Sequence, residues 1–150
     1  LEKQLSIVKE ILPDAKKVGV IYNVGEINSS VQVEALEAVA DKVGVEIVAK
    51  GITNIQDIGV VAKQLSESVD AYYTITDNMV VSGMASLIDV ANQSKIPVFA
   101  SEDGQMDEGI LATESLSYEA LPVLLSLQKQ HFMLKNQQSK YSKSYYHNLL

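Results

Sequence analysis

The chain has 150 residues, a length typical of one domain, and 47% of them are hydrophobic, which is enough to bury a sizeable core. It contains no cysteine, which excludes disulfide scaffolds, thiolate metal sites and cysteine nucleophiles. The formal net charge of -7 and the absence of arginine argue against nucleic acid and anionic membranes as partners. No apolar run reaches the roughly 18 residues of a membrane-spanning helix, so we expect no direct membrane insertion of this chain.

The charge is distributed unevenly along the chain. All 19 acidic residues lie within residues 1–119, whereas residues 120–150 hold lysines, both histidines and no acid. We therefore expect a globular unit over 1–119 and an atypical tail over 120–150, with at most one helix to about Lys135 and a disordered polar segment beyond it. The tail is either a basic, solvated terminus or sequence that a shifted reading frame or a truncation has introduced. Because the chain starts at Leu1 without an initiator methionine, we expect a piece of a longer protein, and the missing signal segment says nothing about location.

Short apolar segments alternate with amphipathic ones along residues 1–119. In chain order, the sequence predicts a lead-in helix (1–12), a buried strand (17–22), a helix opened by the capping box Ser29-x-x-Gln32 and ended by Gly44, and a second strand (45–48). There follow a helix opened by Thr53-x-x-Gln56, a third strand (71–75), a helix with its apolar stripe at Val80, Met84, Leu87, Ile88 and Ala91, a fourth strand (97–100) and a short fifth (110–113). This alternation indicates an α/β fold, with a three-layer parallel sheet of order 2-1-3-4-5 and helices on both faces.

Polar loops leave one edge of the predicted sheet. In an open parallel sheet the ligand lies outside the carboxyl ends of the strands, where the strand order reverses. The loops after strands one, three and four leave those ends and are unusually polar. The candidate ligand-binding residues are therefore Asn23, Glu26, Asn28, Ser29, Ser30, Thr76, Asp77, Asn78, Ser101 and Glu102.

The loop after the first strand has two interpretations. It brings backbone N–H groups and hydroxyls to a helix N-terminus, as a cradle for phosphate or carboxylate does. Alternatively, Ser29 only caps the helix. A single glycine and no lysine exclude the Gly-x-Gly-x-x-Gly and Walker A patterns, which disfavours nucleotide binding by those routes.

The loop after the third strand also has two interpretations. In one, Asp77 or Thr76 caps the following helix and Asn78 is merely exposed. In the other, Asp77, Glu102 and Asp103 form an acidic cluster like the phosphoacceptor pocket of flavodoxin-like receiver domains. Such a pocket needs a second carboxylate where the first strand ends, and this chain has Asn23 there. No nucleophile–base pair is visible, so we expect no enzymatic activity, no cofactor and no bound metal.

Several motifs together resemble one family. They cover residues 11–23 (Ile-Leu-Pro-Asp-Ala-Lys-Lys-Val-Gly-Val-Ile-Tyr-Asn), 25–29, 69–78, 91–101 and 109–113. The pattern, over about residues 3–119, resembles the second lobe of the substrate-binding proteins of ABC importers, in the branch associated with tryptophan and tyrosine uptake. Val24 stands where the family often has proline, and residues from Leu121 onward do not match the expected continuation.

The resemblance implies that residues 1–119 form a ligand-binding lobe, one of the two lobes of a type I periplasmic-binding-protein fold. Two hinged lobes would close on an amino acid, tryptophan or tyrosine above all, and deliver it to an ABC permease subunit. The location would be extracytoplasmic, as a cell-surface lipoprotein or in the periplasm. The loop over 25–30 is expected near the carboxylate or ammonium of the ligand, with 76–78 and 101–102 lining the cleft. The alternative is the effector-binding core of a LacI-type transcriptional repressor, which shares the two-lobe architecture.

Overall fold

The computed structural model describes residues 1–101 and 112–113. The expectations for Glu102, for the boundary near residue 120 and for the tail over 120–150 lie outside the described residues. Within the described residues, helices and strands follow one another in the predicted order, except that the helix predicted between the third and fourth strands is divided in two.

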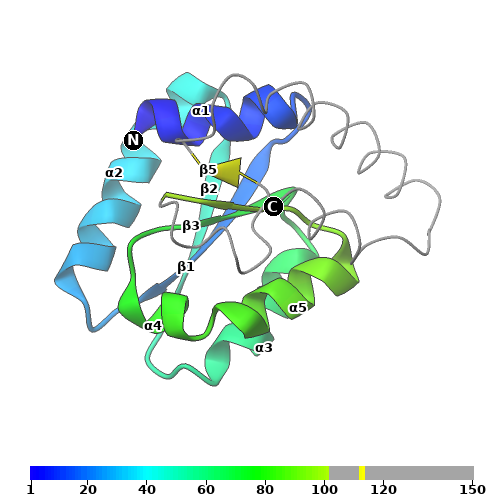
Figure 1. The fold of residues 1–150 in the computed structure, drawn as a ribbon. Helices are drawn as coiled ribbons and strands as arrows, with labels where there is room; N and C mark the ends of the chain where they lie inside the picture. Colours follow the sequence, from blue (N-terminus) through cyan, green and yellow to red (C-terminus); the bar gives the residue numbers. More distant parts are fainter. Residues whose placement is uncertain (102–111, 114–150) are drawn as a thin grey trace.

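A parallel sheet forms the centre of the fold (Figure 1). Its strands are β1 (Lys17–Asn23), β2 (Glu46–Ile52), β3 (Ala71–Thr74), β4 (Val98–Ala100) and β5 (Ala112–Thr113). They lie in the order β2-β1-β3-β4-β5 with every neighbouring pair parallel, which confirms the predicted α/β class and strand order. The pairing of β1 with β2 runs the full length of both strands, whereas β1 pairs with β3 only at Val18↔Ala71 and Gly19↔Tyr72. At the point where the strand order reverses, the carboxyl ends of β1 and β3 therefore share no ladder.

Helices cover both faces of the sheet, as predicted (Figure 1). They are α1 (Glu2–Ile11), α2 (Ile27–Val43), α3 (Asp57–Ser66), α4 (Asn78–Ser82) and α5 (Met84–Ser94). The buried side chains of α1 and α2 pack on one face, and those of α3, α4 and α5 pack on the other. The result is a three-layer arrangement in which each helix buries one apolar stripe.

Two adjacent tyrosines of β3 contribute to the cores on opposite faces of the sheet. Successive side chains of a strand point to opposite faces, and Tyr73 accordingly packs under α1 and α2 while Tyr72 packs under α3 and α5. The Tyr72 hydroxyl donates a 2.6 Å hydrogen bond to the carbonyl oxygen of Ala62. Burial raises the pKa of Tyr72 to about 12, outweighing the opposite effect of a hydrogen bond with Ser66. The two rings therefore lie in the cores on opposite faces of the sheet.

The last predicted helix is not continuous, which corrects the sequence-based expectation. α4 ends at Ser82 and α5 begins at Met84, with Gly83 between them at φ -102° and ψ 14°. A Cβ at position 83 would collide with Ile58 and lie 2.9 Å from Cγ1 of Ile55. The chain therefore passes close to the α3 side of the core, and a side chain at position 83 would require Ile58 and Ile55 to shift.

The predicted helix starts also need correction. The N-cap of α2 is Glu26 rather than Ser29, and the Glu26 carbonyl oxygen already accepts hydrogen bonds from the N–H groups of Ser29 and Ser30. The capping box was therefore predicted three residues too late. The N-cap of α3 is Gln56 rather than Thr53, and no side chain caps either helix. The end of α2 at Gly44, with φ 83°, is as predicted.

Candidate functional site

The candidate residues meet at the carboxyl edge of the sheet, beside the ends of β1 and β3. Because the β1–β3 ladder stops at Gly19 and Tyr72, other groups must hold the two strand ends together. Within the described residues, side chains from the loops after β1 and β3 do this, with hydrogen bonds that span 44 to 54 residues of sequence. The edge is thus joined by side chains instead of by backbone pairing.

Asp77 is the buried centre of this network, with 1% of its surface exposed. Its Oδ2 accepts a 2.7 Å hydrogen bond from the N–H of Asn23, at the end of β1. Its Oδ1 accepts a 3.0 Å bond from the N–H of Val80, which caps α4. The capping interpretation of Asp77 is thus correct, and the carboxylate also connects β1 to the loop after β3.

Glu26 also connects the end of β1 to the residues that follow β3. One carboxylate oxygen, Oε1, accepts a hydrogen bond from Nδ2 of Asn23 at 3.2 Å. The other, Oε2, accepts one from Nδ2 of Asn78 at 3.4 Å. Since a carboxylate has about four acceptor positions, this half-buried group keeps room for further donors.

Asn28 and Thr76 form a second connection, together with a residue that the sequence-based list omits. Nδ2 of Asn28 donates to the carbonyl oxygen of Thr76 at 3.3 Å. Gln32, one helical turn further along α2, donates from Nε2 to the same oxygen at 3.0 Å and accepts from the Thr76 N–H at 3.1 Å. The spacing of four residues, which puts Asn28 and Gln32 on one helix face, was the available signal for including Gln32.

The N-terminus of α2 has donors to offer. The Glu26 side chain is directed to Asn23 and Asn78, so no side chain caps the helix. The N–H groups of Ile27 and Asn28, in the first turn, consequently have no partner among the described residues. With the helix dipole, such N–H groups favour an anion.

The three candidate serines have different environments. Ser29 is fully buried in the first turn of α2, and its Oγ has no hydrogen-bond partner within the described part of the chain. Ser30, next to it, is half-buried. Ser101 follows β4 and its N–H donates to the carbonyl oxygen of Thr74 at 3.0 Å, while its Oγ is likewise buried and without a partner in the described region. Glu102 lies outside the described residues.

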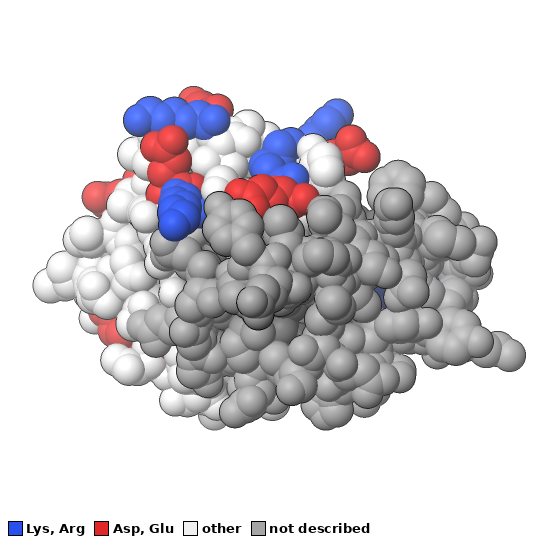
Figure 2. Space-filling model, turned by 45° about the horizontal axis from the view of Figure 1, so that its top comes forward, with Lys and Arg blue, Asp and Glu red and all other residues white. Residues whose placement is uncertain are grey.

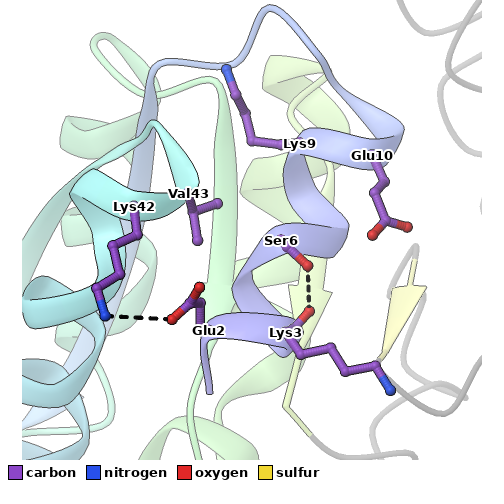
Figure 3. A pocket seen from close by; sticks show the side chains of 7 residues that line it. All are labelled: Glu2, Lys3, Ser6, Lys9, Glu10, Lys42 and Val43. Carbon is purple, nitrogen blue, oxygen red and sulfur yellow. Dashed lines mark hydrogen bonds and ion pairs between the residues drawn. The ribbon is translucent and has the colours of Figure 1, made fainter.

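A groove of about 560 Å³ lies elsewhere, between α1 and the last turn of α2 (Figure 3). It is lined by Glu2, Lys3, Ser6, Lys9, Glu10, Lys42 and Val43. Glu2 and Lys42 form a 3.8 Å ion pair across it, between side chains that are more than half exposed. A 17-residue helix is roughly 25 Å long, so this groove is separated from the α2 N-terminus by the length of the helix. Among the described residues visible in Figure 2, lysine and acidic side chains lie interspersed near the top of the view.

The chemistry of the edge suits binding. The Glu26 carboxylate, exposed amides and free helix N–H groups can form hydrogen bonds with both charged ends of a small zwitterion. In the described ranges 1–101 and 112–113, no group of three His, Asp or Glu residues could hold a metal ion. None of the described helices is both long and apolar enough to span a bilayer.

Comparisons with known proteins point to one family. A profile of the family described as ABC transporter substrate binding protein matches residues 1–123. Over 121 residues the chain is 42% identical to a tyrosine-binding protein of Clostridioides difficile (strain R20291), which covers 81% of this chain and 35% of that protein.

Solved structures extend the comparison. The ligand-free, open structure of a substrate binding protein with adhesive properties from Clostridium difficile is 34% identical, with a TM-score of 0.71 over 95% of this chain and 47% of that one. An ABC domain from Streptococcus pneumoniae in complex with L-Trp gives a TM-score of 0.71 at 22% identity, over 91% of this chain and 45% of that one, and so supports the fold alone.

The chain spans about a third of the curated relative and less than half of each of these solved structures. The fold of one lobe of a substrate-binding protein is confirmed by these matches, as is the resemblance found in the sequence. The chain belongs to the family of ABC transporter substrate binding proteins.

Proposed function

We propose that this chain is a ligand-binding lobe of the solute-binding component of an ABC importer, and that it binds an amino acid at the carboxyl edge of its sheet. The observation that carries the proposal is the pairing of opposite electrostatic features at this edge. The uncapped N-terminus of α2 offers N–H groups to a carboxylate, and the Glu26 carboxylate beside it offers acceptors to an ammonium group.

An aromatic amino acid is the favoured ligand. The 42% identical relative is named a tyrosine-binding protein, and the fold is shared with a domain solved in complex with L-Trp. The residues proposed to form this side of the site remain Asn23, Glu26, Asn28, Ser29, Ser30, Thr76, Asp77, Asn78, Ser101 and Glu102. Asp77 would act indirectly, by holding the loop after β3 in place, because its carboxylate is buried and both of its oxygens accept backbone N–H bonds.

A second lobe would supply the opposite wall of the site. The relatives are two to three times as long as this chain, which leaves room for a body of similar size. Exposed apolar side chains also follow the carboxyl ends of three strands: Val24 after β1, Ile27 at the start of α2, Ile55 after β2 and Val81 in α4. Apolar residues that rim a polar centre are suited to being covered when two lobes close.

The proposed role has consequences for partner and location. A solute-binding component would deliver its ligand to an ABC permease subunit and would work outside the cytoplasm, as a lipoprotein or in the periplasm. It would carry out no chemical reaction on the ligand. These statements rest on membership of the family.

Ligand analogues test the proposal directly. Titrations of the isotopically labelled chain, followed by NMR, would use L-tyrosine, tyramine, which lacks the carboxylate, and 3-(4-hydroxyphenyl)propionate, which lacks the ammonium group. We expect weak binding of L-tyrosine, since one wall of the cleft buries only part of the ligand, with shifts at the amides of residues 27–30 and 76–78. Both analogues should bind less well. Equal binding of tyramine, or shifts confined to the groove beside α1, would contradict the proposal.

A further inference from the structure

Gln32 makes an unusual contact with the loop after β3. Its side-chain amide donates from Nε2 to the carbonyl oxygen of Thr76 and accepts from the Thr76 N–H at Oε1, with distances of 3.0 and 3.1 Å. A primary amide thereby satisfies both backbone polar groups of a single residue, as a neighbouring strand would. A side chain that only filled space would need neither bond.

Asn28 reinforces this contact from the same face of α2. Its Nδ2 donates to the Thr76 carbonyl oxygen at 3.3 Å, and its own carbonyl oxygen lies 3.4 Å from Nε2 of Gln32. Two side chains one turn apart therefore converge on one peptide carbonyl. The first two turns of α2 and the loop after β3 are tied together at this point.

The position of this contact explains why it is needed. The backbone pairing of β1 with β3 ends at Gly19 and Tyr72, so no ladder reaches the loop after β3 from that side. Asp77 connects the loop to Asn23 at the end of β1, and Gln32 of α2 holds Thr76, the residue before Asp77. These bonds therefore keep the first turns of α2 and the loop after β3 in a fixed position relative to each other.

We infer that Gln32 is a positioning residue for ligand binding. By fixing Thr76, it also fixes the position of Asn78, two residues further along, relative to the free N–H groups of α2. The inference rests on the proposed function and adds to it a residue outside the ligand-contacting set. A site that is ordered before the ligand arrives loses less conformational entropy on binding, so removing the Gln32 bonds should weaken affinity without removing a ligand contact.

One test variant is Gln32→Glu, which keeps the length and volume of the side chain and the acceptor for the Thr76 N–H but replaces the NH₂ donor by a second acceptor. This variant loses the bond to the Thr76 carbonyl oxygen and places a negatively charged carboxylate oxygen beside that carbonyl oxygen. The matched control is Gln64→Glu, which adds the same charge to an exposed helical position of α3 where the described residues provide no side-chain hydrogen bond. The decisive variant is Gln32→Met, which is uncharged and of similar length and removes both bonds to Thr76.

Two readouts separate positioning from simple packing. In Gln32→Met, which removes both bonds to Thr76, the amide hydrogen of Thr76 should exchange about tenfold faster in the ligand-free chain. In both Gln32 variants the Kd for L-tyrosine from NMR titration should rise roughly threefold to tenfold. Gln64→Glu should change neither. Unchanged Thr76 exchange, or faster exchange with unchanged affinity, would overturn the inference. If the unaltered chain binds no L-tyrosine, the proposed function fails, while Thr76 exchange still decides whether Gln32 orders the loop.

Discussion

The two ends of β1 are held by similar devices in different surroundings. At the amino end, Oδ2 of Asp70 accepts hydrogen bonds from the N–H groups of Lys16 and Lys17, at 2.8 and 3.0 Å. At the carboxyl end, Asp77 accepts from Asn23 and from the first turn of α4. Asp70 precedes β3 and Asp77 follows it, so residues flanking this one strand hold both ends of β1. We call these two carboxylates the clamps of β1.

The difference lies in what surrounds each clamp. At the amino end the β1–β3 ladder begins at once, and the half-exposed Asp70 supplements backbone pairing. At the carboxyl end the ladder is absent, and the fully buried Asp77 substitutes for it. The amino edge is thus held mainly by backbone pairing and the carboxyl edge by side chains, and the carboxyl edge is where the proposed ligand site lies.

Asp77→Ala should have the largest effect on stability. It removes the acceptor of two N–H groups in a buried position, so we expect a loss of about 2–4 kcal/mol in the free energy of unfolding. Urea denaturation followed by circular dichroism measures this. Asp77→Asn keeps one acceptor oxygen and should lose less. A loss below about 0.5 kcal/mol for the alanine variant would mean that the carboxyl edge does not depend on this clamp.

Gly83→Ala should come next, because its Cβ would collide with Ile58 on the side of the fold that carries α4. Overpacking of this kind costs about 1–3 kcal/mol. Gly59→Ala in α3 is the matched control, since the nearest contact of its Cβ is at 4.0 Å and alanine is the better helix former. Thermal melts should move in opposite directions for the two variants, and a shared direction would contradict the steric account.

Asp70→Ala should cost less than Asp77→Ala, at about 1 kcal/mol. The N–H of Lys16 is exposed and can bond to water once the carboxylate is gone. The same urea titration compares the two aspartates directly. An Asp70 variant that is as unstable as the Asp77 variant would remove the distinction between the two edges.

Deletion of residues 121–150 should have the smallest effect. From its composition we propose that this segment lies outside the ligand-binding lobe, so the melting temperature of the remainder should change by no more than a degree or two, equivalent to under about 0.5 kcal/mol. A large drop in melting temperature would show that the segment is part of the lobe.

Much of the fold could be predicted because it depends on local patterns. The apolar runs of β1 and β3 and the glycine at position 44 follow directly from strand and helix preferences. The strand order then follows from right-handed crossovers. The break at Gly83 was harder, because a glycine inside a helical pattern gives the same signal whether or not another helix passes close to it.

The sequence predicts which loops lie together at the carboxyl edge of the sheet, but not how their side chains contact one another. The switch point of the sheet identified the loops that contain Glu26 and Asp77. The sequence could not indicate that Asp77 binds the N–H of Asn23, or that Gln32 binds Thr76, because these partners are 54 and 44 residues apart and depend on the path of both loops. The Ser29 capping box failed for a local reason, since the helix had already begun at Ile27.

The central claim is that the carboxyl edge binds an amino acid through its ammonium group as well as its carboxylate, and Glu26→Gln tests it most directly. The variant removes the charge but keeps an acceptor oxygen for one amide neighbour. We predict that the Kd for L-tyrosine, measured by NMR titration, rises roughly tenfold or more, while the Kd for 3-(4-hydroxyphenyl)propionate stays unchanged and the urea midpoint is preserved. Equal losses for both ligands, or no loss for L-tyrosine, would contradict the account.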